Sequence, residues 1–300
     1  MTDQVTIIIR SVGERTEVLC KKLILDQGVP EENVFVIRET PFSKAMRVGY
    51  QKGIDNTLKW TYCIDADVLL AGNAIKDMLS IANQQPDEVF TISARLVDKF
   101  FNFPRRVGNH LFRTSSLASM ISNIAPYEKE GIRPETDAKN VLIEKGGIEH
   151  KLDDIIGLHD FEQHYEDIAR KAYVHANKHA EFLGEFVPHW KENAASDDDF
   201  KVALIGLAEG LKFFENVKIN DNEFESLKEL INKLFEKKSE NQHSFDINTY
   251  KKIQNIIGKH REEKIYEVPY SYKRLVKLSG LKLKKDIQNL IKKSSNNISN

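Results

Sequence analysis

The sequence predicts an α/β fold in which a mostly parallel sheet is flanked by helices and followed by a C-terminal helical region. Short runs of apolar and β-branched residues alternate with helically spaced apolar positions over the first 95 residues. Such an alternation is typical of βαβ units, because parallel strands need a crossover connection between them. From about residue 197 onward, only the helical period remains.

Four strands and three helices are expected in the first part of the chain. The strands are predicted at residues 5–9, 34–37, 60–64 and 89–94. The helices are predicted after Thr16 (as the capping residue), around residues 45–54, and at residues 74–82. Less regular strands and loops are expected at 95–158, and further helices at 159–183 (opened by Asp160), 200–214, 223–237 and 248–260.

The length and the charge of the chain limit its organisation and its partners. With 300 residues, the chain has the size of about two domains. We expect one domain at residues 1–195, in the halves 1–95 and 96–195, and a helical region at 196–300. The net charge of −1 gives no signature of a nucleic-acid-binding protein.

Cysteine usage and hydropathy predict a cytoplasmic protein. The two cysteines, Cys20 and Cys63, lie in apolar contexts and suggest no disulfide framework, which fits a reducing compartment. The N-terminal residues lack the basic and apolar regions of a signal peptide. No run reaches the roughly 18–20 apolar residues of a membrane span.

Two aspartates, Asp65 and Asp67, follow directly after the third predicted strand. Like charges this close raise each other's pKa, and a divalent cation between them removes that penalty. Mg²⁺ and Mn²⁺ take carboxylate oxygens together with substrate phosphate oxygens. Ligands of parallel sheets lie beyond the carboxyl ends of the strands. The pair is therefore predicted to hold Mn²⁺ or Mg²⁺ in a cleft there, although an isolated Asp-x-Asp also occurs at solvated strand ends.

The first 95 residues resemble the nucleotide-binding half of a GT-A glycosyltransferase, a Rossmann-like fold, and are most similar to the family 2 group. An apolar strand leads to the turn Glu14-Arg15-Thr16, a second strand ends in Glu39, and Asp65 and Asp67 follow a third. The resemblance implies a nucleotide-sugar donor bound through Ser11, Arg15, Glu39 and Asp65, with its diphosphate bridged by a metal to the Asp-x-Asp. Family members usually carry Asp where this chain has Glu39.

The same resemblance implies a carboxylate base roughly 90–100 residues beyond the Asp-x-Asp, at the start of a helix. Asp160 lies there, and the helix dipole would keep it ionised to accept a proton from an acceptor hydroxyl. A plain helix cap is the alternative reading of Asp160. His159 is expected to complete the metal shell, or else to be a structural histidine. A second candidate acid is Glu135, which follows Pro134 at an expected helix start or turn.

Two other patterns suggest binding sites outside the cleft. His175 and His179 have the i, i+4 spacing that places two imidazoles on one helix face, as in some zinc sites, but no Cys lies nearby. Residues 271–293 contain eight Lys or Arg and one acid, with leucines and isoleucines between 275 and 291. A basic amphipathic helix of this kind suits an anionic membrane surface, and the alternative is a terminal helix that packs on the body.

These patterns together predict a metal-dependent glycosyltransferase that transfers a sugar from a nucleotide-diphosphate donor to a hydroxyl acceptor. A glycan or a lipid-linked acceptor in cell-surface polysaccharide or glycoconjugate synthesis is expected, with peripheral contact to the inner face of the membrane through the basic C-terminal helix. One alternative is a sugar nucleotidyltransferase, although the turn after the first strand has a single glycine, Gly13. The other is a non-catalytic binding protein on the same fold.

Overall fold

The computed structural model of the protein describes residues 2–101, 103–126, 134–212, 221–238, 251, 254–258 and 282–285. These residues belong to two compact units. The sheet unit contains the described residues within 2–99, 104–162 and 251–258, and the helical unit contains the others. The units divide after residue 162, earlier in the chain than the boundary that the sequence suggests at 195.

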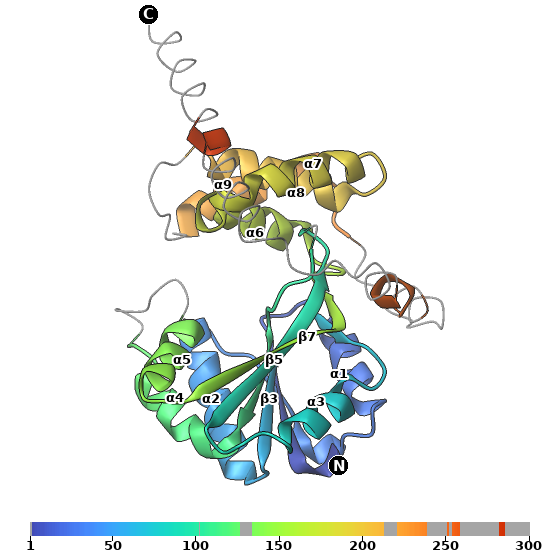
Figure 1. Ribbon diagram of the computed structural model, residues 1–300. Helices are drawn as coiled ribbons and strands as arrows, with labels where there is room; N and C mark the ends of the chain where they lie inside the picture. The colour runs from blue at the N-terminus through green and yellow to red at the C-terminus, as the bar shows by residue number, and fades with distance from the viewer. Residues whose placement is uncertain are drawn as a thin grey trace, which may run out of the picture. The chain divides into compact units, whose positions relative to one another are not determined.

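A seven-stranded mixed sheet forms the centre of the sheet unit, in the order β2-β1-β3-β6-β5-β7-β4. Figure 1 labels three of its strands, β3, β5 and β7. The strands are β1 (Val5–Arg10), β2 (Val34–Ile37), β3 (Trp60–Asp65), β4 (Val68–Leu70), β5 (Val89–Asp98), β6 (Asn109–Arg113) and β7 (Ile148–His159). β1 pairs in parallel with β2 and β3, and β5 pairs in parallel with β7. The carboxyl ends of these five strands therefore lie at one edge of the sheet.

The sheet is only partly parallel, which corrects the expectation of a mostly parallel sheet. β6 lies between β3 and β5 and is antiparallel to both, and β4 is antiparallel to β7. The sequence suggests only the first four parallel strands because they carry long apolar runs. β4 has only three residues, which is too short for a distinct pattern. β6 has the sequence Asn-His-Leu-Phe-Arg, in which polar residues interrupt any apolar run.

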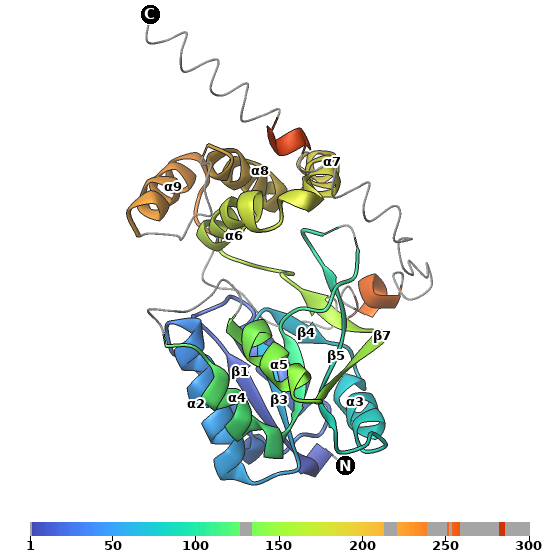
Figure 2. The ribbon, with the colours of Figure 1, turned by 60° about the vertical axis from the view of Figure 1, so that its left-hand side comes forward.

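Helices cover both faces of this sheet. α1 (Glu17–Leu25) and α3 (Ala74–Ala82) lie on one face, and α2 (Phe42–Asn56), α4 (Leu117–Asn123) and α5 (Pro134–Glu144) lie on the other (Figures 1 and 2). Successive residues of β1 point to opposite faces, so that Ile7 and Ile9 join one core while Ile8 joins the other. Burying each of these side chains contributes about 1.5–3 kcal/mol, which holds β1 between the two layers of helices.

The helical unit contains α6 (Tyr165–Lys178), α7 (Leu183–Asn193), α8 (Asp198–Gly210) and α9 (Asp221–Leu234). Gly206 and Gly210 of α8 let it approach α6 closely, since a Cβ at either position would lie 2.3 Å from a carbonyl oxygen of α6. α6 therefore packs with the later helices, and the helical unit begins before residue 195. The helices predicted at 200–214 and 223–237 correspond to α8 and α9.

Short 3-10 helices complete the regular structure at Thr2–Gln4, Glu31–Asn33, Thr114–Ser116 and Ala180–Phe182. Of the helix predicted at 248–260, residues 251 and 254–258 are described and are helical. The basic segment 271–293 lies outside the described residues except for 282–285. Among the helices that the structure describes, none has the length and apolar character needed to cross a membrane.

Gly157 allows the close pairing of β4 with β7, because a Cβ there would lie 2.4 Å from the backbone oxygen of Leu69. We predict that Gly157→Ala forces these strands apart and lowers the free energy of unfolding by about 1–3 kcal/mol. Urea denaturation followed by circular dichroism measures this change. Asp154→Ala, at an exposed position of the same strand, is the control and is expected to shift stability by less than about 0.5 kcal/mol. Equal stability of the two variants would contradict the prediction.

Candidate metal centre

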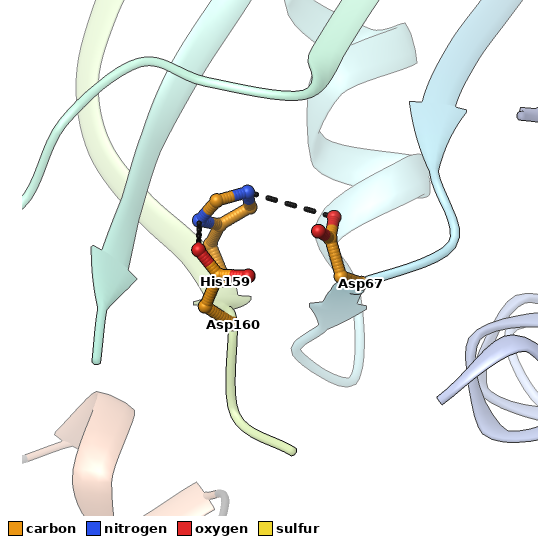
Figure 3. A group of neighbouring side chains, drawn as sticks. All are labelled: Asp67, His159 and Asp160. Atoms are coloured by element: carbon orange, nitrogen blue, oxygen red, sulfur yellow. Dashed lines mark ion pairs between the residues drawn. The ribbon is translucent and has the colours of Figure 1, made fainter. Parts of the chain in front are cut away.

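Asp67, His159 and Asp160 come together where β3 and β7 end (Figure 3). Asp67 lies in the turn between β3 and β4, and His159 is the last residue of β7. The antiparallel pairing of β4 with β7 places Val68 opposite His159, and the backbone N–H of Asp160 donates to the carbonyl oxygen of Asp67 at 3.2 Å. The backbone of two strands thus makes neighbours of side chains that are distant in the sequence.

The three side chains form a buried set of candidate metal ligands, and Figure 3 shows them pointing toward one another. Their ligand atoms all lie within 4.8 Å of one another. His159 Nε2 is 3.5 Å from Asp67 Oδ1, and His159 Nδ1 is 3.1 Å from Asp160 Oδ2. Two carboxylates and an imidazole suit Mn²⁺ and related divalent ions. No other group of three or more His, Cys, Asp or Glu side chains with this geometry is found among the described residues.

Two residues that the sequence analysis does not single out, Asp98 and Arg105, support this group. Asp98 ends β5 and lies opposite His159 in the parallel pairing with β7. Its Oδ2 lies 2.8 Å from His159 Nδ1 and accepts a hydrogen bond from Arg105 Nε at 2.7 Å. The signal in the sequence is weak, because a single Asp after an apolar strand has many ordinary explanations.

The charges around His159 favour a cation. Burial would lower the pKa of this imidazole, but Asp160, Asp67 and Asp98 together outweigh burial and raise its pKa to about 10. Three formal negative charges then face the imidazolium and Arg105, which leaves one negative charge in excess. A divalent ion that displaces the imidazole proton would make the formal charge zero. The residues present therefore fit a divalent metal.

Asp160 does not begin a helix, which corrects one expectation from the sequence. It follows β7 with φ +58°, in the left-handed region, and α6 begins at Tyr165 with His164 as its N-cap residue. Non-glycine residues in this region cost of order 1–3 kcal/mol and are concentrated at functional sites. Because no helix begins at Asp160, the expected effect of a helix dipole on the ionisation of its carboxylate does not apply. Its neighbours are His159 and the backbone of Asp67.

The two acids of the Asp-x-Asp have different partners. Asp65 accepts a hydrogen bond from Arg10 Nε at 2.8 Å, across the β1–β3 pair. The pKa of Asp65 is raised to about 6. Burial and the charges of Asp67 and Glu135 raise it, and together they outweigh Arg10, which lowers it. Gly108 packs against Asp65, since a Cβ at this glycine would lie 2.8 Å from Asp65 Oδ2. Asp65 is therefore fixed beside Arg10 and outside the group of three ligands.

Glu135 extends this second charged cluster. It is the second residue of α5, as Pro134 predicts. Glu135 Oε1 accepts hydrogen bonds at 2.8 Å from Arg10 Nη1 and from the Tyr50 hydroxyl. Burial would raise the pKa of Glu135, but Arg10, His110 and other groups lower it to about 2. Burial lowers the pKa of His110 to about 4, so that the ring is neutral at pH 7. Arg10 thus links the carboxylates of Asp65 and Glu135.

Three further residues predicted to bind the donor lie in the turns after β1 and β2. Ser11 Oγ donates to Glu14 Oε2 at 2.8 Å. Arg15 is nine-tenths buried, and its Nε donates to Glu162 Oε1 at 3.1 Å, which joins the turn after β1 to the segment after Asp160. Glu39 is about one third exposed and pairs with Lys44 at 2.7 Å. The role of each in donor binding stays a prediction.

The other histidine pattern has a different environment. His175 and His179 lie on α6 and its C-cap, with ring centroids 4.9 Å apart. Both rings contact Phe101 edge-on, at 5.5 and 6.0 Å between centroids. Among the described residues, no third His, Cys, Asp or Glu joins them in a candidate metal group. Their aromatic surroundings indicate a part of the core of the helical unit.

The pKa of His159 leads to a pH dependence of metal binding. At pH 7 the imidazole carries a proton in the metal-free protein, since its pKa is raised to about 10. We predict that Mn²⁺ binding releases about one proton and becomes tighter as the pH rises from 6 to 8. Isothermal titration in two buffers of different ionisation enthalpy measures the release, with Asp67→Asn as the variant that lacks a ligand. Binding that weakens with rising pH, or shows no buffer dependence, would contradict this account.

Comparisons with known proteins give similar solved structures only. No protein-family model matches the chain, and no curated protein matches it. Three solved structures show what the chain resembles. A glycosyltransferase involved in the glycosylation of the major capsid of PBCV-1 has 16% identity and a TM-score of 0.36, over 50% of this chain and 82% of that one.

A mannosyltransferase from Pyrobaculum calidifontis, in complex with GDP-Man and Mn²⁺, has 10% identity and a TM-score of 0.42, over 96% of this chain and 87% of that one. CMP:2-keto-3-deoxy-manno-octonic acid synthetase complexed with CTP has 10% identity and a TM-score of 0.36, over 52% of this chain and 92% of that one. Two of the three are glycosyltransferases, and the third is a synthetase. With TM-scores below 0.5, the function is better inferred from the site itself.

Proposed function

We propose that this chain is a metal-dependent glycosyltransferase of the GT-A type, which transfers a sugar from a nucleotide-diphosphate donor to a hydroxyl acceptor. The observation that carries the proposal is the buried group of Asp67, His159 and Asp160 at the edge where β1, β2, β3, β5 and β7 end. Ligands of α/β sheets bind beyond this edge. The group fits a divalent ion there, and the second half of the Asp-x-Asp supplies one of its ligands.

The residues around this edge can bind and orient a diphosphate donor. Asp67, His159 and Asp160 would hold Mn²⁺ or Mg²⁺, which when bound would neutralise charge on the departing nucleoside diphosphate. Arg15 lies in the turn after β1, with its guanidinium held by Glu162. Arg10 fixes the orientation of the Asp65 carboxylate. In this orientation, Asp65 would contact the ribose or the diphosphate of the donor. Ser11 and Glu39, at the ends of the two neighbouring strands, complete the proposed donor site.

Asp160 has two candidate roles in this proposal. As a base it would accept the proton of the acceptor hydroxyl, and as a ligand it would share a metal ion with Asp67 and His159. Its place in the group of candidate ligands, whose atoms lie within 4.8 Å of one another, favours the second role. A carboxylate engaged with a cation is a weaker base, so that the two roles can be separated by experiment.

The acceptor is proposed to be a glycan or a lipid-linked precursor in cell-surface polysaccharide or glycoconjugate synthesis. The basic residues between 271 and 293 support this proposal through their sequence pattern, since a cationic amphipathic helix suits an anionic membrane surface. A cytoplasmic enzyme at the inner face of the membrane would then have access to a nucleotide-sugar donor in solution and to an acceptor at the membrane.

Donor binding tests the proposed function. We predict that at least one of a panel of UDP-, GDP-, CMP- and dTDP-sugars binds in the presence of Mn²⁺, and that binding weakens by at least about tenfold without the ion. Isothermal titration of the full chain measures both affinities. Asp67→Asn should show the weak, metal-independent binding only, whereas Asp77→Asn, at an exposed position of α3, should match the parent protein. If no sugar nucleotide binds in either condition, the proposal is wrong.

The variant Asp160→Asn separates the two roles of this residue. We predict that it weakens Mn²⁺ binding by at least about tenfold, because one of the two ligand carboxylates is lost. Donor binding in the presence of Mn²⁺ should weaken with it. Paramagnetic resonance of free Mn²⁺ measures the first quantity and isothermal titration the second. Unchanged Mn²⁺ and donor binding, together with loss of sugar transfer, would instead assign Asp160 to proton transfer alone.

A further inference from the structure

The Nδ1 side of the His159 ring contacts Asp98 at 2.8 Å and Asp160 at 3.1 Å. Asp98, the nearer of the two, lies outside the candidate ligand group, as does its partner Arg105. We propose that Asp98 is the positioning residue of the metal centre: its carboxylate, held by Arg105, orients His159 so that Nε2 faces the ion. The inference rests on the proposed function, because it takes His159 as a metal ligand. It goes further by assigning residues that would touch neither the ion nor the substrate.

The hydrogen-bond geometry supports this role directly. Oδ2 of Asp98 lies 2.8 Å from His159 Nδ1 and 2.7 Å from Arg105 Nε. With a proton on Nδ1 donated to Asp98, the lone pair of a neutral imidazole lies on Nε2, which is 3.5 Å from Asp67. Carboxylate partners of this kind fix the orientation of metal-binding histidines and increase their basicity. The ring is therefore held in the orientation that coordination requires.

The backbone keeps the carboxylate of Asp98 in place. Asp98 lies opposite His159 in the β5–β7 pairing, and the N–H of Lys99 donates to the carbonyl oxygen of His159 at 3.2 Å. Arg105 is anchored by two backbone hydrogen bonds with Leu96, of 2.8 and 2.9 Å. The side chain of Asp98 is fully buried. Since both ends of the hydrogen-bonded chain are attached to β5 or β7, the ring has little freedom to turn.

A simpler role for Asp98 is that of a buried ion pair that stabilises the fold without any effect on a metal. A comparable carboxylate in the same part of the sheet allows the two roles to be separated. Asp153 on β7 pairs with Arg95 and Arg106 at 2.7 and 2.6 Å. Its side chain is exposed, and it lies outside the candidate ligand group. Replacing Asp153 therefore removes an acid and its arginine contacts but leaves the support of His159 unchanged.

The experiment measures Mn²⁺ affinity and coordination in four proteins: the parent chain, Asp98→Ala, Asp98→Asn and Asp153→Asn. Continuous-wave paramagnetic resonance gives the free Mn²⁺, and electron spin-echo envelope modulation detects ¹⁴N bound to the ion. We expect Asp98→Ala to weaken Mn²⁺ binding by about 10–100-fold and to reduce the ¹⁴N signal. Asp98→Asn should lie between Asp98→Ala and the parent chain, because its amide oxygen can still accept from Nδ1–H. Asp153→Asn should bind as the parent chain does.

The possible outcomes distinguish this inference from the proposed function. If the parent chain binds Mn²⁺ and Asp67→Asn does not, while both Asp98 variants bind with unchanged affinity and ¹⁴N signal, only the positioning role is wrong. If the parent chain binds no Mn²⁺, both the metal centre and the positioning role fail. Should Asp98→Ala not fold, Asp98→Asn alone decides, because a reduced ¹⁴N signal and weaker Mn²⁺ binding in a folded protein support the role, and an unchanged signal and affinity overturn it.

Discussion

The candidate metal centre depends on the antiparallel pairing of β4 with β7. This pairing places Val68 opposite His159 and so brings the turn that carries Asp67 beside the end of the long strand β7. Gly157 makes the approach possible, because any larger side chain would meet the backbone of β4. β5, on the other side of β7, positions the acid that supports the imidazole. Three strands from separate parts of the chain thus define the centre.

Electrostatics explains why the carboxyl edge holds two charged clusters instead of one. Each buried acid needs a partner, since a lone buried charge costs several kcal/mol. Arg10 meets this need for Asp65 and Glu135, which leaves Asp67 to the cluster around His159. Arg105 and the imidazolium offset only part of the charge there. Each cluster keeps one negative charge in excess, because His110 beside Glu135 is neutral. Only the second brings two carboxylates and an imidazole within 4.8 Å of one another, as a divalent ion requires.

The sequence predicts the local parts of this arrangement and misses the parts that depend on tertiary pairing. The strand at residues 34–37 and the helix at 74–82 are found with the predicted bounds, because apolar runs and a helical period are local signals. Asp67 and His159 lie together in the structure, and the binding of a metal by them, which the resemblance implies, stays a prediction. Three features arise from contacts between distant segments: the roles of β4 and β6, the positive φ of Asp160, and the support of His159 by Asp98. A single sequence carries no local pattern that indicates such contacts.

A crystal of the full chain soaked in Mn²⁺ would test the central claim most directly. Anomalous diffraction at the manganese absorption edge locates the ion without reference to activity, donor or acceptor. This account predicts one strong peak within about 2.0–2.3 Å of carboxylate oxygens of Asp67 and Asp160 and of His159 Nε2. A peak bound to Asp65 instead, or no peak at this edge of the sheet, would contradict it.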